Sequence, residues 1–237
     1  MNASGVAQVA TVRLLVEDPD LAERVPLGQR DAAIAACQVP LLTVPPGVWQ
    51  APRSSAPGDL GLLVLDGICL RAFELDQRRG VVLLGPGDLI KPWSTTPDGS
   101  ENARATQWRC LTPLRLAVLD GRFVTQIGDY PELAGELIER VLERNRELVM
   151  HLAIAAQTRV DTRLHLMLWQ MAAKWGRMRP DGLLLPLRLT HTVLSELVAS
   201  RRPTITTALA ELSQRGLVQR VEQGWLLRGD PPEELAL

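Results

Sequence analysis

The sequence contains few cysteines and no long apolar run. Its three cysteines, Cys37, Cys69 and Cys110, lie far apart and include no Cys-x-x-Cys pair, which argues against a disulfide framework and favours a reducing compartment. No apolar stretch reaches the roughly 18 residues that a membrane-spanning helix requires. The first residues also lack the basic and apolar segments of a secretion signal. We therefore expect a cytoplasmic protein that has no membrane partner.

Histidine is equally rare. The three histidines are His151, His165 and His191, so none falls in the first 150 residues. A metal-dependent enzyme built on a β-barrel would need several histidine and carboxylate ligands inside the barrel. No serine or cysteine has a histidine at the spacing of a nucleophilic motif. We therefore expect no catalytic residue, no metal site and no cofactor. A metal-dependent enzyme on a β-barrel is kept as a remote alternative function.

The chain as a whole is not basic. Its formal net charge is −1, from 26 Lys and Arg against 27 Asp and Glu, so any affinity for nucleic acid must come from a local patch. Lysine occurs only at Lys91 and Lys174, and nearly every cation is an arginine. Arginine makes bidentate contacts with phosphate and guanine that lysine does not match.

Residues 39–119 carry the pattern of a β-domain, in which short apolar runs alternate with clusters of Gly, Pro and Asp. Strands at such spacing predict an antiparallel sandwich or barrel. Residues 62–65 and 68–75 predict a hairpin with a tight turn at Asp66-Gly67. Leu114, Leu116 and Val118 alternate as in a half-buried strand. Residues 18–37, which precede this region, predict short helices.

The period changes to that of a helix at Asp129, which we expect to cap the helix, with Pro131 in its first turn and Glu132 three residues on. Apolar residues then follow steps of four and three, a heptad seam that is typical of a helix with a partner helix. A polar residue within the seam, Asn145, commonly fixes the register. We predict a homodimer helix, and the alternative is a core helix packed on its own domain. The dimer contacts predicted on it are Ile138, Val141, Asn145, Leu148 and Leu152.

A second amphipathic helix is predicted after the first. Asp161 is its expected cap, and Leu164, Met167, Leu168, Met171 and Trp175 share one face. The sequence Pro180-Asp181-Gly182 is expected to end it.

The segment from Thr190 to Leu227 carries the most specific indication of function in the sequence. Thr190 caps a predicted short helix with buried Leu194, Leu197 and Val198, and Pro203 fits the first turn of a second helix that Gly216 ends. Two short helices joined by such a turn form a helix-turn-helix. Residues 217–221 and 225–227, around Gln223-Gly224, predict a two-stranded wing.

The outward face of this second helix has the chemistry of a DNA reader. Arginine reaches guanine, a threonine methyl contacts thymine, and hydroxyls and helix N-terminal amides hold phosphates. The alternative is a solvated helix end of a winged protein-interaction domain. We predict double-stranded DNA as the partner, contacted by Ser200, Arg201, Arg202, Thr204, Thr206 and Thr207.

From about residue 41 to 227 the chain resembles the CRP/FNR family of bacterial transcription regulators. The resemblance rests on Gly61-Leu-Leu-Val-Leu-Asp-Gly67, on Leu84-Gly-Pro-Gly-Asp-Leu89, on the dimer helix and on residues 191–210 as the helix-turn-helix. It implies that Arg202 reads guanine. The chain departs from the family at Pro203, where a glutamate usually reads cytosine, and at Thr207, where the family has an arginine. The half-site sequence that the family's best-known member reads should therefore not be assumed for this protein.

The barrel departs further from the nucleotide-binding members of the family. These carry Phe-Gly-Glu after the Gly-Asp turn, whereas here Gly87-Asp88-Leu89-Ile90 is followed by Lys91-Pro92-Trp93. Arg104 stands near the position of the family's phosphate clamp but lacks its hydroxyl neighbour. We expect no control by cyclic nucleotides, and we name Arg104 and Trp93 as candidate effector contacts.

Together these patterns predict an α+β protein: an N-terminal antiparallel β-barrel or jelly roll, a long dimerisation helix and a C-terminal winged helix-turn-helix. The predicted segments are 1–128 (sensory β-domain), 129–158 (dimerisation helix) and 159–237 (DNA-binding domain). The expected function is sequence-specific transcription regulation as a homodimer on a near-palindromic operator. RNA polymerase and an unidentified small effector are further candidate partners. The alternative is a constitutive DNA-binding dimer with a non-sensing barrel.

Overall fold

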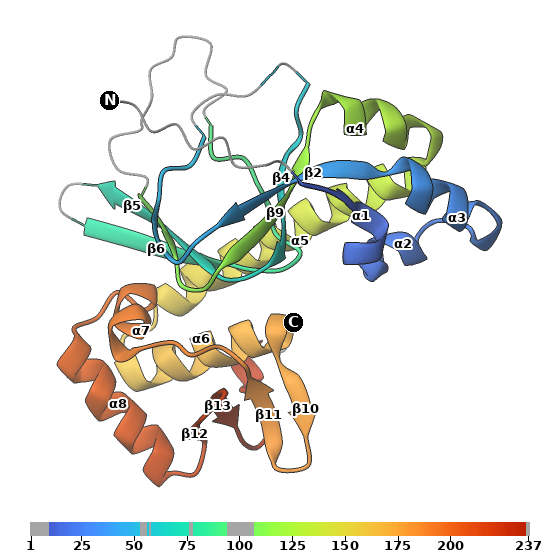
Figure 1. Ribbon diagram of the computed structural model, residues 1–237. Coiled ribbons are helices and arrows are strands. Elements are labelled where there is room, and N and C mark those ends of the chain that lie inside the picture. Colours follow the sequence, from blue (N-terminus) through green and yellow to red (C-terminus); the bar gives the residue numbers. More distant parts are fainter. Residues whose placement is uncertain (1–9, 53–55, 57, 76–77, 94–106, 236–237) are drawn as a thin grey trace. The chain divides into compact units, whose positions relative to one another are not determined.

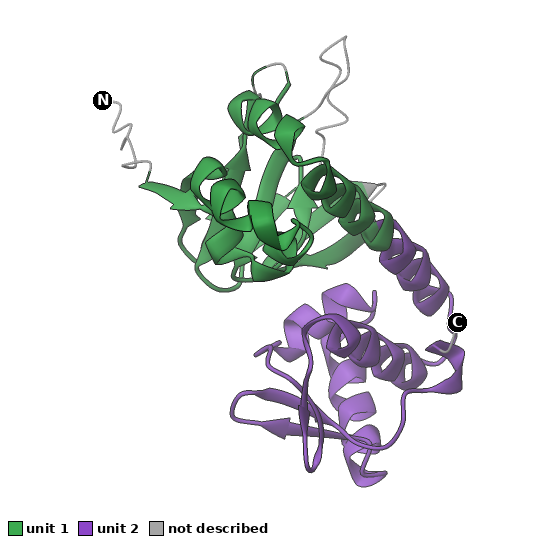
Figure 2. Ribbon diagram, turned by 90° about the vertical axis from the view of Figure 1, so that its right-hand side faces the viewer, with its two compact units in different colours: residues 1–144 green, residues 145–237 purple. Residues whose placement is uncertain are grey.

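The computed structural model describes residues 10–52, 56, 58–75, 78–93 and 107–235 (Figure 1). The chain divides into two compact units, residues 1–144 and 145–237, and the division falls inside the long helix α5 (Pro131–Ala155) (Figure 2). The three predicted segments, with boundaries at residues 128 and 158, stay a prediction. Within the described residues, no helix is both long enough and apolar enough to cross a membrane.

The first unit contains two antiparallel sheets and confirms the predicted α+β class (Figure 1). The first sheet has the order β1-β2-β9-β4-β7. Its strands are β1 (Ala10–Arg13), β2 (Gln38–Val44), β9 (Leu114–Leu119), β4 (Gly61–Asp66) and β7 (Leu89–Ile90). The second sheet has the order β3-β8-β5-β6. Its strands are β3 (Gly47–Trp49), β8 (Gln107–Cys110), β5 (Cys69–Leu75) and β6 (Arg78–Leu84).

The hairpin predicted around Asp66-Gly67 is wrong. Strand β4 pairs with β7 and β9, whereas β5 pairs with β6 and β8, so the chain passes from one sheet to the other at this turn. Gly67 has a φ of +91°, and a Cβ there would collide with the carbonyl oxygen of Pro113. Only glycine fits such a backbone. The hairpin of this region is formed instead by β5 and β6.

Strand β9 is more buried than its sequence pattern predicts. Leu114 and Leu116 are buried as expected, but Ala117 and Leu119 are buried too, and Val118 is half-buried. The reason is that β9 is an inner strand, hydrogen-bonded to β2 and to β4. A strand in the middle of a covered sheet buries both faces and loses its simple alternation.

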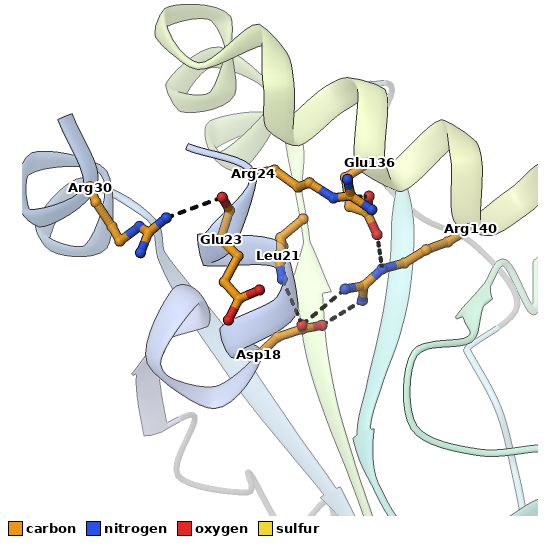
Figure 3. A network of polar contacts seen from close by, with 7 residues as sticks. All are labelled: Asp18, Leu21, Glu23, Arg24, Arg30, Glu136 and Arg140. Atoms are coloured by element: carbon orange, nitrogen blue, oxygen red, sulfur yellow. Dashed lines mark hydrogen bonds and ion pairs between the residues drawn. The ribbon is translucent and has the colours of Figure 1, made fainter. Parts of the chain in front are cut away.

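The short helices predicted for residues 18–37 are present as α2 (Pro19–Glu23) and α3 (Leu27–Ala36). Helix α1 (Leu14–Glu17) precedes that range and was not predicted. Asp18 caps α2, because its carboxylate accepts a hydrogen bond from the Leu21 amide at 3.1 Å. The same carboxylate binds the guanidinium of Arg140 on α5, with 2.9 Å between Oδ1 and Nη2 (Figure 3). This contact joins the N-terminal helices to the long helix.

The long helix starts later than predicted. After α4 (Gly121–Gln126), Asp129 closes the 3-10 turn η1 (Ile127–Asp129), and α5 begins at Pro131. Asp129 is therefore not its cap. Pro131 does occupy the first turn, where a missing N–H costs no helical hydrogen bond.

The second unit contains three helices and a third antiparallel sheet. The helices are α6 (Val160–Trp175), α7 (His191–Leu197) and α8 (Arg202–Gln214), followed near the C-terminus by the turn η2 (Glu233–Leu235). The sheet has the order β10-β11-β13-β12. Its strands are β10 (Arg177–Arg179), β11 (Gly182–Leu185), β12 (Val218–Val221) and β13 (Gly224–Leu227).

Two predictions for α6 are wrong at its ends. Arg159 holds the cap position, and Asp161 lies inside the first turn, where its carboxylate binds Arg159 with 2.8 Å between Oδ2 and Nη2. The hydrogen bond from Arg159 is the main cause that lowers the pKa of Asp161. The helix ends at Trp175, and residues 180–181 form the turn between β10 and β11 rather than its stop.

Candidate nucleic-acid interface

Helix α7 and the turn after it form as the sequence predicts. The Thr190 hydroxyl oxygen accepts a hydrogen bond from the Val193 amide at 3.2 Å, and this caps the helix. Leu194, Leu197 and Val198 are buried. The turn that follows contains Ala199 with a φ of +48°, a left-handed conformation that is uncommon for residues other than glycine. This backbone reverses the chain within a few residues and sets the start of α8.

Helix α8 begins at Arg202 and presents one apolar face to its own unit. Pro203 lies in its first turn, and Gly216, with a φ of +71°, follows its end. This helix packs against α6 and α7, so its opposite face is left for solvent. The buried positions, all predicted, are Ile205, Ala208, Leu209 and Leu212.

The predicted DNA contacts gather at the N-terminal end of this outer face. Arg201, Arg202, Thr204, Thr206 and Thr207 are exposed, and Ser200 is half-buried. The Thr206 hydroxyl donates to the Arg202 carbonyl at 3.2 Å, and the Thr207 hydroxyl donates to the Pro203 carbonyl at 3.3 Å. Both side chains are exposed, and these bonds tie their hydroxyls to the preceding turn of the same helix. Contact with bases stays a prediction.

His191 belongs to the same surface, and sequence reasoning missed it. Its Nδ1 lies 3.0 Å from the Thr206 hydroxyl oxygen, and its ring centroid lies 6.4 Å from that of Trp225 on β13. Burial is the main cause that lowers the pKa of His191, and the nearby Arg220 and Arg202 lower it further. The only signal in the sequence was its place directly after the Thr190 cap. The separation of 15 residues from Thr206 hid the contact.

The predicted wing is present and is part of a larger sheet. Strands β12 and β13 pair as expected, and β13 also pairs with β11, which in turn pairs with β10. Arg220 on β12 lies over the Trp225 ring at 5.7 Å and is exposed. The wing therefore adds a further cation beside the start of α8. The sequence analysis missed β10 and β11.

The outer face of α5 is exposed along the predicted heptad seam. Ile138 is 61% exposed and Leu152 is 70% exposed in the single chain, which is unusual for large apolar side chains. Val141, Asn145 and Leu148 are exposed as well. Leu142 and Val149 follow Val141 and Leu148 directly, are also exposed, and widen the stripe. Their part in a dimer is a prediction that the single chain does not test.

The inner face of α5 packs on its own unit, so the alternative of a core helix holds for that face. Leu133 and Leu137 are buried in the core of the first unit. One and two turns later, Arg140 binds Asp18, and Arg144 donates to the Leu83 carbonyl at 3.0 Å. Burial alone would lower the pKa of Arg140, but its bonds to Asp18 and Glu136 raise it.

Residues 162–232 match the family model described as "Crp-like helix-turn-helix domain". The chain carries a Crp-like helix-turn-helix domain. A CRP-like cAMP-activated global transcriptional regulator of Mycobacterium tuberculosis is 26% identical over 166 residues, which are 69% of this chain and 73% of the relative. The regulatory protein CysR of Synechococcus elongatus is 30% identical over 62% of this chain and 64% of its own length. These relatives are regulators and not enzymes.

Solved structures show the same fold. A cyclic nucleotide-binding domain containing protein from Listeria monocytogenes has a TM-score of 0.64 at 15% identity, covering 78% of this chain and 87% of its own. A CooA mutant from Carboxydothermus hydrogenoformans has a TM-score of 0.62 at 15% identity and covers 96% of both chains. The resemblance to the CRP/FNR family is confirmed, with a cyclic-nucleotide-binding-like N-terminal domain before the Crp-like domain.

The β-domain that precedes the Crp-like domain has three tryptophans in one core cluster. Trp93, a candidate effector contact, is 7% exposed and lies in a core cluster with Trp49 and Trp108. The rings of Trp49 and Trp108 meet edge to face with centroids 5.4 Å apart. Nearby, the Lys91 ammonium donates to the Asp59 carbonyl at 3.1 Å. Arg104, the other candidate, lies outside the described residues. Both roles stay predictions.

Proposed function

We propose that this chain is a DNA-binding transcription regulator that acts as a homodimer on a near-palindromic operator. The exposed N-terminal end of α8 carries the proposal. Arg201 and Arg202 stand there in a Crp-like domain whose inner face is fully packed. The relatives found are named as transcription regulators. A protein that binds DNA is expected in the cytoplasm, and RNA polymerase is a further predicted partner there.

The chemistry of α8 fits the major groove. The guanidinium of Arg202 can donate two parallel hydrogen bonds to O6 and N7 of guanine. Arg201, one residue before the helix, and the free amides of the first turn suit phosphate oxygens. The methyl groups of the exposed Thr206 and Thr207 suit thymine. Arg220 on the wing is placed for a phosphate contact, which adds affinity but no sequence preference.

The exposed stripe of α5 supplies the proposed dimer contact. Two copies would bury Ile138, Val141, Leu148 and Leu152 against each other, with Asn145 setting the register. Such a dimer has two-fold symmetry and presents two copies of α8. The operator is then near-palindromic, with half-site centres about one helical turn, roughly 34 Å, apart.

Selection of bound DNA from a random pool by the full-length protein tests the proposal. We expect enrichment of a near-palindrome with one guanine-containing half-site per protomer. Recovery of no preferred sequence from a well-folded dimer would overturn the proposed readout. A preferred sequence without two-fold symmetry would overturn the proposed homodimeric mode.

Whether the barrel senses an effector is a second question. Trp49, Trp93 and Trp108 are buried in its core, and this burial supports the alternative of a constitutive dimer with a non-sensing barrel. The Mycobacterium tuberculosis relative, in contrast, is named as cAMP-activated. An effector would act by shifting α5 between two states. Thermal unfolding with a metabolite panel separates these alternatives, because a ligand that binds the native state stabilises it.

A further inference from the structure

Two cysteines that are 41 positions apart in the sequence face each other in the first unit. Cys69 on β5 and Cys110 on β8 are register partners, and their sulfur atoms lie 4.0 Å apart. Both are free thiols and both are buried, at 0% and 2% exposure. The sequence places these two cysteines far apart, and the pairing of β5 with β8 brings them together.

The strand register suits a covalent bond between them. The Leu111 amide donates to the Ile68 carbonyl at 2.8 Å, one step along the ladder from this pair. Cys69 and Cys110 therefore form a non-hydrogen-bonded pair, in which opposing Cα atoms are about 4.5 Å apart. Disulfides span Cα separations of roughly 4.4–6.8 Å with a sulfur–sulfur bond of about 2.05 Å. The sulfurs must approach each other by side-chain rotation, and the strands already lie at a suitable separation.

The residues around Cys69 and Cys110 determine which oxidants can reach the two sulfurs. Trp108 stands two residues before Cys110 on the same face of β8, and both are buried. On the edge strand β3, the residue opposite Cys110 is Gly47, which has no side chain to cover it. A small molecule of about the size of water can reach such a site during local opening of the edge. Oxidised glutathione is much larger than a peroxide, so we expect it to react far more slowly with this buried pair.

We propose that Cys69 and Cys110 form a two-electron redox site that a small peroxide converts to a cross-strand disulfide. The Cys110 thiolate attacks one peroxide oxygen, the O–O bond breaks, and the leaving hydroxide takes a proton to become water. The resulting sulfenic acid is attacked by the Cys69 sulfur. The S–S bond forms, the S–O bond breaks, and a second water leaves with the Cys69 proton. A dithiol reductant reverses the reaction.

The order of attack follows from the thiol pair itself. The hydrogen bond between the two thiols lowers the pKa of Cys110. The same contact, together with burial, raises the pKa of Cys69. Cys110 also lies opposite Gly47 of the edge strand β3, whereas Cys69 lies on the inner strand β5. Because the thiolate is the nucleophile, Cys110 reacts first and Cys69 resolves the sulfenic acid. Cys37 is buried, burial raises its pKa, and it has no such neighbour.

The site lies close to an anchor of α5. Cys69 pairs with Leu84 on β6, and the neighbouring Leu83 carbonyl accepts the hydrogen bond from Arg144. The side-chain rotation that closes the disulfide between β5 and β8 takes place beside this contact. We infer that oxidation changes DNA affinity through α5, an extension that rests on the proposed function.

Peptide mass spectrometry of the reduced full-length protein tests the site without DNA. After hydrogen peroxide, alkylation and unfolding, we expect the loss of two of the three thiols and a linked Cys69–Cys110 peptide. Oxidised glutathione should leave all three thiols free. Cys37→Ala should keep the link, and Cys110→Ala should abolish it, with circular dichroism showing that each variant is folded. If the Cys110→Ala variant is unfolded, Cys69→Ser replaces it and should also abolish the linked peptide.

Three free thiols after peroxide, or sulfinic acid without a linked peptide, would overturn the redox site. The oxidised and reduced proteins are then titrated with the selected DNA, and a changed affinity that dithiothreitol reverses is expected. Equal affinities would overturn the coupling to α5. A failure to bind any DNA would count against the proposed function, because the linked peptide is measured independently of it.

Discussion

His191 and Thr206 join the two helices of the helix-turn-helix through one hydrogen bond, with 3.0 Å between Nδ1 and Oγ1. The Thr206 hydroxyl also lies 3.2 Å from the Arg202 carbonyl oxygen, and when it donates there it accepts from the Nδ1–H tautomer of His191. The start of α7 therefore holds the first turn of α8 on the side where Arg202 emerges.

The first prediction concerns this histidine. Burial, Arg220 and Arg202 lower the pKa of His191 in the free protein, and DNA phosphates beside it would raise the pKa again. Binding then takes up a proton, so DNA affinity should increase as pH falls from about 8 to 6, on either side of the ordinary pKa near 6.5. His191→Gln should flatten this part of the profile. An identical slope in the variant would remove His191 from the interface.

Arg202→Ala should abolish site-specific binding while leaving folding and dimerisation intact. A bidentate guanine contact contributes about 1–3 kcal/mol of discrimination, which is roughly 5- to 150-fold in affinity. Mobility-shift titration at fixed salt measures this loss of affinity for the operator. Arg215→Ala is the matched control, because Arg215 is an exposed arginine at the other end of the same helix. Unchanged operator preference in Arg202→Ala would contradict the assigned readout.

Ile138→Asp combined with Leu148→Asp should give monomers. Both side chains are exposed on the outer face of α5, so a charge there should not unfold the single chain, but burying it in an apolar seam without a partner is costly. Ala153→Asp adds a charge at an exposed position outside the seam and serves as the control. Sedimentation measures the result. A folded, dimeric double variant would place the interface elsewhere.

Acid should destabilise the second unit through His165. Burial is the main cause that lowers the pKa of this histidine, and Arg215 lowers it further. The Trp169 indole N–H also donates to its Nε2 at 3.0 Å, which requires that nitrogen to be unprotonated. Below about pH 6.5 the unfolded state binds the proton and the folded state resists it, so the free energy of unfolding falls with pH.

His165→Gln keeps an acceptor for the Trp169 indole and removes the titration. Thermal unfolding at pH 7 and pH 5 should show a smaller loss of stability in this variant than in the wild type. Equal losses in the two proteins would mean that other groups cause the acid sensitivity.

Cyclic AMP and cyclic GMP should bind weakly or not at all. The resemblance implies that Pro92 stands at the position of the family's ribose-binding glutamate, and proline has no backbone N–H to donate instead. Losing one partner of a buried charged pair costs about 2–5 kcal/mol, or roughly 30- to several thousand-fold in affinity. Calorimetric titration decides the point. A micromolar complex would show that another residue replaces the missing carboxylate.

The helix-turn-helix could be predicted from the sequence because its signals are local. Thr190, Pro203 and Gly216 each act on a helix end within a few residues, and the buried positions follow the helical period. The same holds for the exposed seam of α5. Asp161 misled the prediction because a carboxylate in the first turn of a helix resembles one at the cap.

The pairing of strands could not be predicted in this way. Whether Asp66-Gly67 closes a hairpin or crosses between sheets depends on the distant Pro113. The approach of Cys69 to Cys110 and of Asp18 to Arg140 depends on the register of elements far apart in the chain. The contact of His191 with Thr206 was missed for the same reason, because the two residues lie on successive helices.

Asp18 binds the amide of Leu21 and the guanidinium of Arg140 with one carboxylate. Opening of α2 therefore removes an anchor of α5, and release of α5 leaves the α2 cap without its charged partner. Segments linked in this way tend to open as one cooperative unit. Amide hydrogens of α2 and of the middle of α5 should then exchange with deuterium at a common rate, and proteolysis in the N-terminal helices should report on the state of the long helix.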